Sequence, residues 1–440
     1  MSSKHPLKLL VERQKNGQAC GIYSLCSANE YVITAAMERA LADKDYVLIE
    51  ATANQVNQFG GYTGMRPADF RDFVYSLALK AGFPYDKILL GGDHLGPLTW
   101  QAEIAETALE KSRELIRQYV LAGFTKIHID TSMKLADDSP DGPLETAIIA
   151  ARGAMLAREA ELAFTQVRQM NPEALSPVYV VGSEVPIPGG SRDSEEYIHV
   201  TEAADFERMV ETFKHAFQQY RLENAWENVI AVVVQPGVEF GDECIHAYER
   251  PAAGRLSRSL QKYPGLVFEG HSTDYQTARA LKEMVEDGIA ILKVGPALTF
   301  ALREGLFALS HMEAELFRFS AEVEQSRFME ALDSCMAYHP ENWLQHYRGR
   351  PGEIRYARKF SFSDRCRYYL PAMEVKMALD RLMKNLQLVD IPLTLLSQFM
   401  PVQYKKVRDG LLQPDVQSLL KDRIINCIDD YLYAVKPGRS

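Results

Sequence analysis

The sequence lacks the features that would place this protein in a membrane or on nucleic acid. No apolar stretch reaches the ~20 residues that a bilayer-spanning helix needs, and residues 1–18 are basic and polar, without the apolar centre of a signal peptide. The formal net charge is -10, so a polyanion such as nucleic acid is repelled. The sequence therefore predicts a cytoplasmic protein with no membrane and no nucleic-acid partner.

Cysteine is scarce, and several common catalytic motifs are absent. The six cysteines form no CxxC pair and have no zinc-finger spacing, so we expect reduced thiols and no cysteine-bound zinc. The patterns G-x-x-x-x-G-K-[ST], G-x-S-x-G and H-E-x-x-H do not occur. Their absence argues against a P-loop sugar kinase and against hydrolases of the corresponding types.

The sequence does contain a unit repeated eight times, in which a short apolar run ends in a polar residue and helix-like sequence follows. Apolar runs without polar alternation are typical of strands buried on both faces. They cover residues 21–26, 46–52, 87–94, 126–132, 178–184, 229–237, 266–272 and 290–296. Eight such strands alternating with helices predict an α/β fold, a (β/α)8 TIM barrel.

Between the runs, apolar positions three and four apart predict amphipathic helices. They cover residues 29–42, 67–81, 104–122, 144–169, 202–219, 275–286 and 297–315. After residue 315 the sequence is typical of helices broken by proline and glycine, and no further strand is predicted. We therefore expect a barrel over residues 1–315 and a helical extension packed on it over residues 316–440.

The polar residues that close the runs are the site candidates, because a TIM barrel carries its chemistry at the carboxyl ends of its strands. They are Glu50, Asp93, His94, Asp130, Ser132, Glu184, Gln235, Glu239, Glu269, His271 and Lys293. So many carboxylates would repel one another unless protonated or bound to a cation. We therefore expect one divalent metal, zinc or manganese. The expected ligands are His94, Glu239, Glu269 and His271.

Two carboxylates are expected to be catalytic, Asp93 beside His94 and Glu184 before a proline-stiffened loop. A buried Asp–His pair can also be structural. Lys293 could form a Schiff base, anchor a phosphate or make a structural ion pair. The polar, glycine-rich residues 58–64 suit a loop that covers substrate, although glycines also serve plain turns. The expected substrate-binding residues are Glu50, Gly60, Gly61, Ser272, Lys293 and Gly295.

Seven motifs, in their order along the chain, give the sequence a resemblance to a known family. They are NQFGGYTGM at 57–65, GGDHLGP at 91–97, EVPIPGG at 184–190, VQPGVEF at 234–240, HSTDYQ at 271–276, LKVGPALTF at 292–300 and SDRCRYY at 363–369. This set resembles the non-catalytic Z subunits of tagatose-bisphosphate aldolase, the GatZ/KbaZ family. The resemblance implies a barrel related to class II, zinc-dependent aldolases that supports the activity and stability of a catalytic Y subunit in galactitol or N-acetylgalactosamine breakdown.

The chain also departs from class II aldolases at the positions that would bind zinc. Asp93 and His94 match the pair of the third strand, and Glu184 matches the Glu before the Gly-Gly loop. Glu239 or Val238, and Glu269, stand where the aldolases have two more histidines. Carboxylates in place of imidazoles harden such a site, which argues against aldol chemistry by this chain alone.

The polar residues are nevertheless kept, which leaves two other hypotheses open. One is a metal-dependent epimerase acting on a ketohexose or its phosphate, and the other is a structural partner with a vestigial pocket. The additional helical segment offers a surface for the Y subunit or for a homo-oligomer.

Overall fold

Eight parallel strands close into a barrel in the computed structural model, which describes residues 4–182 and 198–436. The strands are β1 (Ile22–Leu25), β2 (Val47–Thr52), β3 (Ile88–Leu95), β4 (Lys126–Ile129), β5 (Val178–Val181), β6 (Val229–Val234), β9 (Val267–Gly270) and β10 (Ile289–Val294). Each pairs with the next barrel strand along the chain, and β10 pairs with β1 to close the ring. The predicted (β/α)8 barrel is confirmed.

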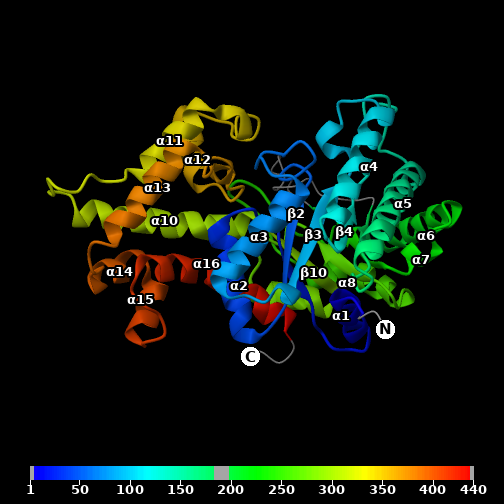
Figure 1. The fold of residues 1–440 in the computed structure, drawn as a ribbon, viewed down its shortest axis with the longest axis horizontal. Helices are drawn as coiled ribbons and strands as arrows, with labels where there is room; N and C mark the ends of the chain where they lie inside the picture. Colours follow the sequence, from blue (N-terminus) through cyan, green and yellow to red (C-terminus); the bar gives the residue numbers. More distant parts are fainter. Residues whose placement is uncertain (1–3, 183–197, 437–440) are drawn as a thin grey trace.

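Helices surround the barrel on the outside (Figure 1). Those between the strands are α2 (Glu30–Asp43), α3 (Pro67–Ala81), α4 (Ala105–Leu121), α5 (Thr146–Met170), α6 (Ala203–Gln219), α7 (Glu223–Trp226), α8 (Arg250–Ser259) and α9 (Ala278–Glu286). The sequence did not predict α7 or α8, which are short. In the loop after β6, β7 (Glu239–Phe240) and β8 (Ile245–His246) form a small antiparallel sheet. No helix of the described residues is long and apolar enough to cross a bilayer.

The first helix, α1 (Pro6–Lys15), seals the amino-terminal end of the barrel. Its buried Leu7 and Val11 pack against strand residues that include Leu48 of β2 and Val267 of β9. Side chains two residues apart on a strand point to the same face. The lumen positions that follow this apolar layer are therefore Glu50 on β2 and Glu269 on β9, and both are fully buried. The polar part of the lumen therefore begins directly after the apolar layer that Leu7 and Val11 close, on the side toward the carboxyl ends of the strands.

The C-terminal segment completes the helix ring. It follows α10 (Pro296–Leu316), and it contains α11 (Phe328–Tyr338), α12 (Pro351–Phe360), α13 (Met373–Leu386), α14 (Leu393–Phe399), α15 (Pro401–Arg408) and α16 (Val416–Val435). Figure 1 shows α10 running from the barrel into the group of C-terminal helices, with α16 beside it. The last helix, α16, packs on α9, α2 and β1. The division at residue 315 stays a prediction, and α16 joins the two segments across it.

A buried ion pair ties α10 to the C-terminal segment. Arg303 Nε lies 3.1 Å from Asp364 Oδ1, and both residues are at most 2% exposed. Asp364 Oδ2 also accepts a hydrogen bond of 2.6 Å from Thr299 Oγ1. Removing one partner of a buried ion pair leaves an uncompensated charge in a low-dielectric surrounding, which is strongly destabilising.

We expect Asp364→Asn to lower the free energy of unfolding by about 3–5 kcal/mol, because Arg303 keeps its charge and loses its counterion. Urea unfolding followed by circular dichroism measures the change. The matched control is Glu353→Gln, which breaks an exposed pair with Arg350 and should lower the free energy of unfolding far less, because solvent screens exposed pairs. Equal losses for the two variants would show that the buried pair has no special role.

Candidate functional site

Four charged side chains form an ionic layer in the barrel lumen. Lys126 Nζ of β4 lies 2.6 Å from Glu50 Oε1 and 2.7 Å from Glu269 Oε2, and all three side chains are fully buried. Lys293 of β10 pairs with the other oxygen of Glu50, and its Nζ lies 2.9 Å from Asp93 Oδ1. From Asp93, which lies directly above the four residues of the layer, to Glu269 the charges therefore alternate in sign across the barrel.

A glycine makes room for this layer. Gly91 of β3 occupies the lumen position between Leu89 and Asp93, beside Glu50. A Cβ atom at residue 91 would lie 2.6 Å from Glu50 Cγ, which is closer than real contacts allow. Gly91, the first residue of the motif at 91–97, is therefore required because the Glu50 side chain packs against β3 at this position.

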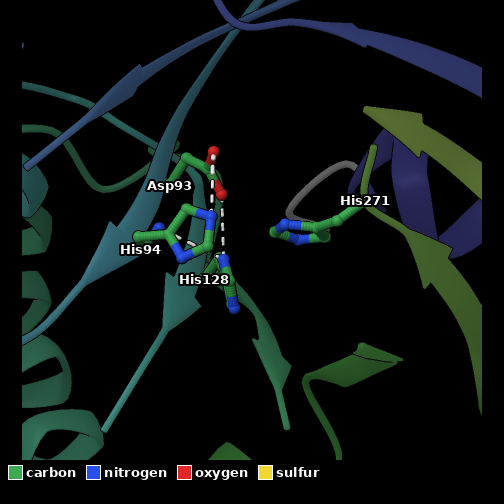
Figure 2. Close-up of side chains that lie close together, drawn as sticks. All are labelled: Asp93, His94, His128 and His271. Carbon is green, nitrogen blue, oxygen red and sulfur yellow. Dashed lines mark hydrogen bonds and ion pairs between the residues drawn. The ribbon is translucent and has the colours of Figure 1, made fainter. Parts of the chain in front are cut away.

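Three imidazoles and one carboxylate lie directly above the ionic layer, at the carboxyl ends of the strands (Figure 2). One potential ligand atom each of Asp93, His94, His128 and His271 lies within 4.8 Å of the others. The ring centroids of the three histidines are 4.8–5.1 Å apart. All four residues are buried. Such a donor set suits zinc, which binds imidazole nitrogen and carboxylate oxygen.

Each imidazole contacts a carboxylate through one ring nitrogen. His94 Nδ1 lies 2.8 Å from Asp130 Oδ2, and His271 Nε2 lies 3.1 Å from Glu269 Oε1. His128 Nδ1 lies 2.9 Å from Asp93 Oδ1. For His94 and His271 these contacts leave the second ring nitrogen for a ligand, the arrangement that carboxylates impose on metal-binding histidines. His128 Nδ1 also accepts the His94 amide at 3.1 Å, so this ring offers Nε2 to a metal only in the tautomer that gives up this amide contact.

One ring nitrogen of this group is a buried polar atom without a partner. His128 Nε2 has no hydrogen-bond partner within residues 4–182 and 198–436. A buried polar group left unpaired costs free energy that a bound metal would recover. The side chains present therefore fit a divalent cation. The unpaired ring nitrogen supports the expectation of a bound metal independently of the sequence.

The pKa directions follow from burial and from the opposite charges. Burial disfavours the carboxylate of Asp93, but Lys293 and His94 outweigh it and hold the pKa of Asp93 well below its usual range. Burial lowers the pKa of His271 to about 3, so this ring is neutral at pH 7. Burial alone would lower the pKa of His94, but Asp93 and Asp130 raise it.

A cavity of about 130 Å³ lies over this group. Its walls include Asp93, His94, His271, Lys293 and Ser272. The loop after β2 contributes Gln55 and Tyr62, and the C-terminal segment contributes Arg367 and Tyr368. The cavity thus joins residues from both ends of the chain above the imidazoles.

The structure places the other predicted site residues as follows. Ser272 and Gly295 line the cavity, but the Gly295 amide already donates to Asp274 Oδ1 at 3.0 Å. Gly60 and Gly61 shape the loop that carries Gln55 and Tyr62. A Cβ atom at residue 61 would lie 2.3 Å from the Gln55 carbonyl oxygen. Glu184 lies outside the described residues.

Two of the expected metal ligands are placed differently. Glu269 contacts Lys126 and His271, one layer below the imidazoles. Glu239 is buried in β7, where its Oε1 accepts the Phe240 amide at 2.9 Å. Within the described parts of the chain, neither belongs to the group of converging ligand atoms. The converging group instead contains two imidazoles besides His94, those of His128 and His271, and His271 is one of the expected ligands.

Sequence reasoning missed Lys126 and His128, and also Cys26 and Arg367, which line the cavity. A signal for two of them existed, since Lys126, His128 and Asp130 alternate with apolar residues on β4 and just beyond it, as lumen-facing positions do. Arg367 had no local signal of this kind. It reaches the cavity only because the C-terminal segment folds back over the barrel.

Comparisons with known proteins agree on one family. Residues 7–436 match the model of the family described as D-tagatose-1,6-bisphosphate aldolase subunit GatZ/KbaZ-like. The chain is 46% identical to proteins named D-tagatose-1,6-bisphosphate aldolase subunit GatZ from Salmonella dublin and Salmonella enteritidis, with 98% of this chain and 99% of each relative covered.

A solved structure is also similar over nearly its whole length. It is described as a probable tagatose 6 phosphate kinase from Sinorhizobium meliloti 1021, with 45% identity, a TM-score of 0.85, and 94% of this chain and 100% of that chain covered. From the family match and the identities, the chain belongs to the D-tagatose-1,6-bisphosphate aldolase subunit GatZ/KbaZ-like family.

Proposed function

We propose that this protein is the non-catalytic Z subunit of a tagatose-1,6-bisphosphate aldolase and assembles with a catalytic Y subunit in the cytoplasm. The observation that carries the proposal is the near-complete coverage of relatives that bear the subunit's name. The pathway that the resemblance implies is galactitol or N-acetylgalactosamine breakdown. The C-terminal helices offer the surface for the Y subunit or for a second copy of the chain.

We further propose that the group of Asp93, His94, His128 and His271 holds one divalent metal, zinc or manganese. Three imidazoles favour zinc over magnesium or calcium, which prefer oxygen ligands. When bound, such a metal would act as a Lewis acid toward a carbonyl or hydroxyl oxygen of a sugar. Glu269 and Asp130 would orient the rings of His271 and His94.

The charge of the site supports a cation. The carboxylates in and above the ionic layer are Glu50, Asp93, Asp130 and Glu269, and the lysines are Lys126 and Lys293. Four carboxylates against two lysines leave an excess of two negative charges before the imidazoles are counted. A divalent cation would balance that excess in a surrounding where unpaired charge is costly.

The metal proposal predicts that His128→Ala weakens zinc binding by more than the ~10–100-fold that loss of an orienting carboxylate typically costs. Dialysis against buffered zinc followed by elemental analysis measures the metal per chain. The matched control is His215→Ala, an exposed imidazole on α6, which should keep the wild-type metal content. We also expect Glu239→Gln to keep it. Wild-type protein without bound metal, or undiminished binding by His128→Ala, would contradict the proposal.

The subunit proposal predicts that co-expression with a catalytic Y subunit raises the aldolase activity and melting temperature of that subunit. A partner that binds only the folded state adds about 2.7 kcal/mol at a concentration one hundred times its dissociation constant. Thermal unfolding and turnover are measured with and without this chain. A Y subunit that behaves identically in both samples would rule the assembly out.

The geometry also supports a second candidate function, a metal-dependent epimerase acting on a ketohexose or its phosphate. A vestigial site should refill with apolar side chains, whereas this one keeps an ionised Asp93 and the imidazoles of His94 and His271 around a cavity. In this function the three imidazoles hold the metal without Asp93, Asp93 is the base, and Glu184 is the second carboxylate that the sequence proposes. The two functions can coexist in one chain.

An independent epimerase should interconvert tagatose, fructose or sorbose, or their phosphates, when zinc or manganese is added. We expect Asp93→Asn to lower the rate roughly 10²–10⁴-fold, since it keeps the shape and removes the base. Product sugars are followed by chromatography, and metal content is measured in the same samples. No turnover by the wild-type chain would end the epimerase hypothesis and leave the subunit proposal standing.

A further inference from the structure

Two neighbouring cavities share one wall at the carboxyl end of the barrel. The inner chamber is the cavity of about 130 Å³ over Asp93, His94 and His271. The outer chamber, of about 470 Å³, is lined by the start of α2, by α10 and by α13. Residues that line both chambers are Cys26, Gln55, Tyr62, Gly295 and Arg367. The inner chamber alone is smaller than the ~300–1,000 Å³ of typical ligand sites, so a ligand reaching the imidazoles would extend toward the outer chamber.

Arg367 is the cationic residue of this shared wall, and the chain holds it in place. It belongs to a short 3-10 helix, Arg365–Tyr368, of the C-terminal segment. Its Nη1 donates to the Ser363 carbonyl oxygen and, at 2.9 Å, to the Asp364 carbonyl oxygen. Its Nη2 donates to Tyr368 Oη at 2.9 Å, and the guanidinium lies 4.4 Å from the centre of the Tyr368 ring. The position of the charge is therefore fixed before a ligand arrives.

The guanidinium of Arg367 has donors to spare, and the nearest opposite charges, Asp364 and Asp274, act on it only from beyond ion-pair distance. Of the carboxylates within residues 4–182 and 198–436, none forms an ion pair with it. A guanidinium carries five N–H donors, and the three bonds to Ser363, Asp364 and Tyr368 leave Nε–H and one Nη2 hydrogen. A partly buried cation that has free N–H donors, forms no direct ion pair and lies on a cavity wall is suited to bind an anion.

The other positive features of the inner chamber are already used. Lys293 pairs with Glu50 and Asp93. The amino-terminal end of α10, where a barrel commonly binds phosphate, is occupied by Asp274. Its Oδ1 accepts the Gly295 amide at 3.0 Å and the Ala297 amide at 2.8 Å. Among these positive groups of the inner chamber, Arg367 therefore remains available to bind an anionic ligand.

The outer chamber has one further cation, Lys376 of α13. Its side chain is exposed to solvent, where screening by salt weakens its attraction for an anion. Arg367 is less exposed and is fixed by three hydrogen bonds, so it is the better placed of the two to select a ligand.

We propose that Arg367 binds the terminal anion, a phosphate or a carboxylate, of an open-chain sugar whose reactive carbons lie over the inner chamber. The assignment of the ligand as a sugar rests on the proposed function. The assignment of an anionic group, and of Arg367 as the residue that binds it, rests on the residues that line the two chambers. The C-terminal segment thereby sets the specificity of the barrel. Arg367 acts by binding one end of the ligand, at a distance from the imidazoles.

The test compares binding of three probes to the zinc-treated full chain by isothermal titration calorimetry. The probes are tagatose 1,6-bisphosphate, tagatose, and the analogue of tagatose with a carboxylate at carbon 6. We expect Arg367→Met to weaken binding of the anionic probe that wild type prefers by about 10–100-fold and to leave tagatose binding unchanged, since only the charged hydrogen bonds are lost. Arg367→Lys should recover part of the loss. The preferred probe tells phosphate from carboxylate.

The control is Arg365→Met, two residues away. Arg365 lines neither chamber and donates through Nη1 to the Asn342 carbonyl oxygen at 2.9 Å. Melting temperatures of all variants exclude unfolding as the cause of a loss. The inference is overturned if Arg367→Met binds the anionic probes as wild type does, if it loses tagatose equally, or if wild type prefers neither anion over tagatose. Each of these outcomes leaves assembly with the Y subunit to be judged by its own experiment.

Discussion

The candidate site depends on the ammonium group of Lys126, held between the carboxylates of Glu50 and Glu269. Without it, two fully buried carboxylates would face each other across the lumen, where charge repulsion is barely screened. Each carboxylate that Lys126 holds in place contacts a further residue and so restricts the position of that residue. Glu50 fixes Lys293, which in turn contacts Asp93, and Glu269 contacts the ring of His271. Lys126 thus sets the positions of groups that lie one layer above it.

The lumen is ordered in three layers by the two-residue period of the strands. Leu7 and Val11 of α1 close an apolar layer, the lysines and glutamates follow, and the imidazoles lie at the opening. The apolar layer keeps water from the ionic one on its lower side. This order explains why a polar lumen is compatible with a stable barrel, since each buried charge has a partner and the polar groups are confined to one end.

The C-terminal segment belongs both to the fold and to the site. Its last helix, α16, packs on β1, α2 and α9, and the Tyr431 hydroxyl donates to the Thr273 carbonyl oxygen at 2.8 Å. Between α10 and α16 the chain carries Arg367 and Tyr368 to the cavity wall. The buried pair of Arg303 and Asp364 fixes the start of that stretch. The same segment therefore completes the ring of helices and one wall of the cavity.

The sequence by itself determined the barrel, because strands buried on both faces must be apolar throughout and their polar ends must meet at one rim. It also placed Asp93, His94 and His271 at that rim. The layer that each polar side chain occupies could not be predicted in this way, because it depends on the register between neighbouring strands. Glu269 therefore meets Lys126 instead of joining the imidazoles, and His128 takes the place at the imidazole layer. The place of Arg367 on the cavity wall follows from the tertiary structure alone. A residue about 70 positions after the last barrel strand reaches the cavity only through long-range packing.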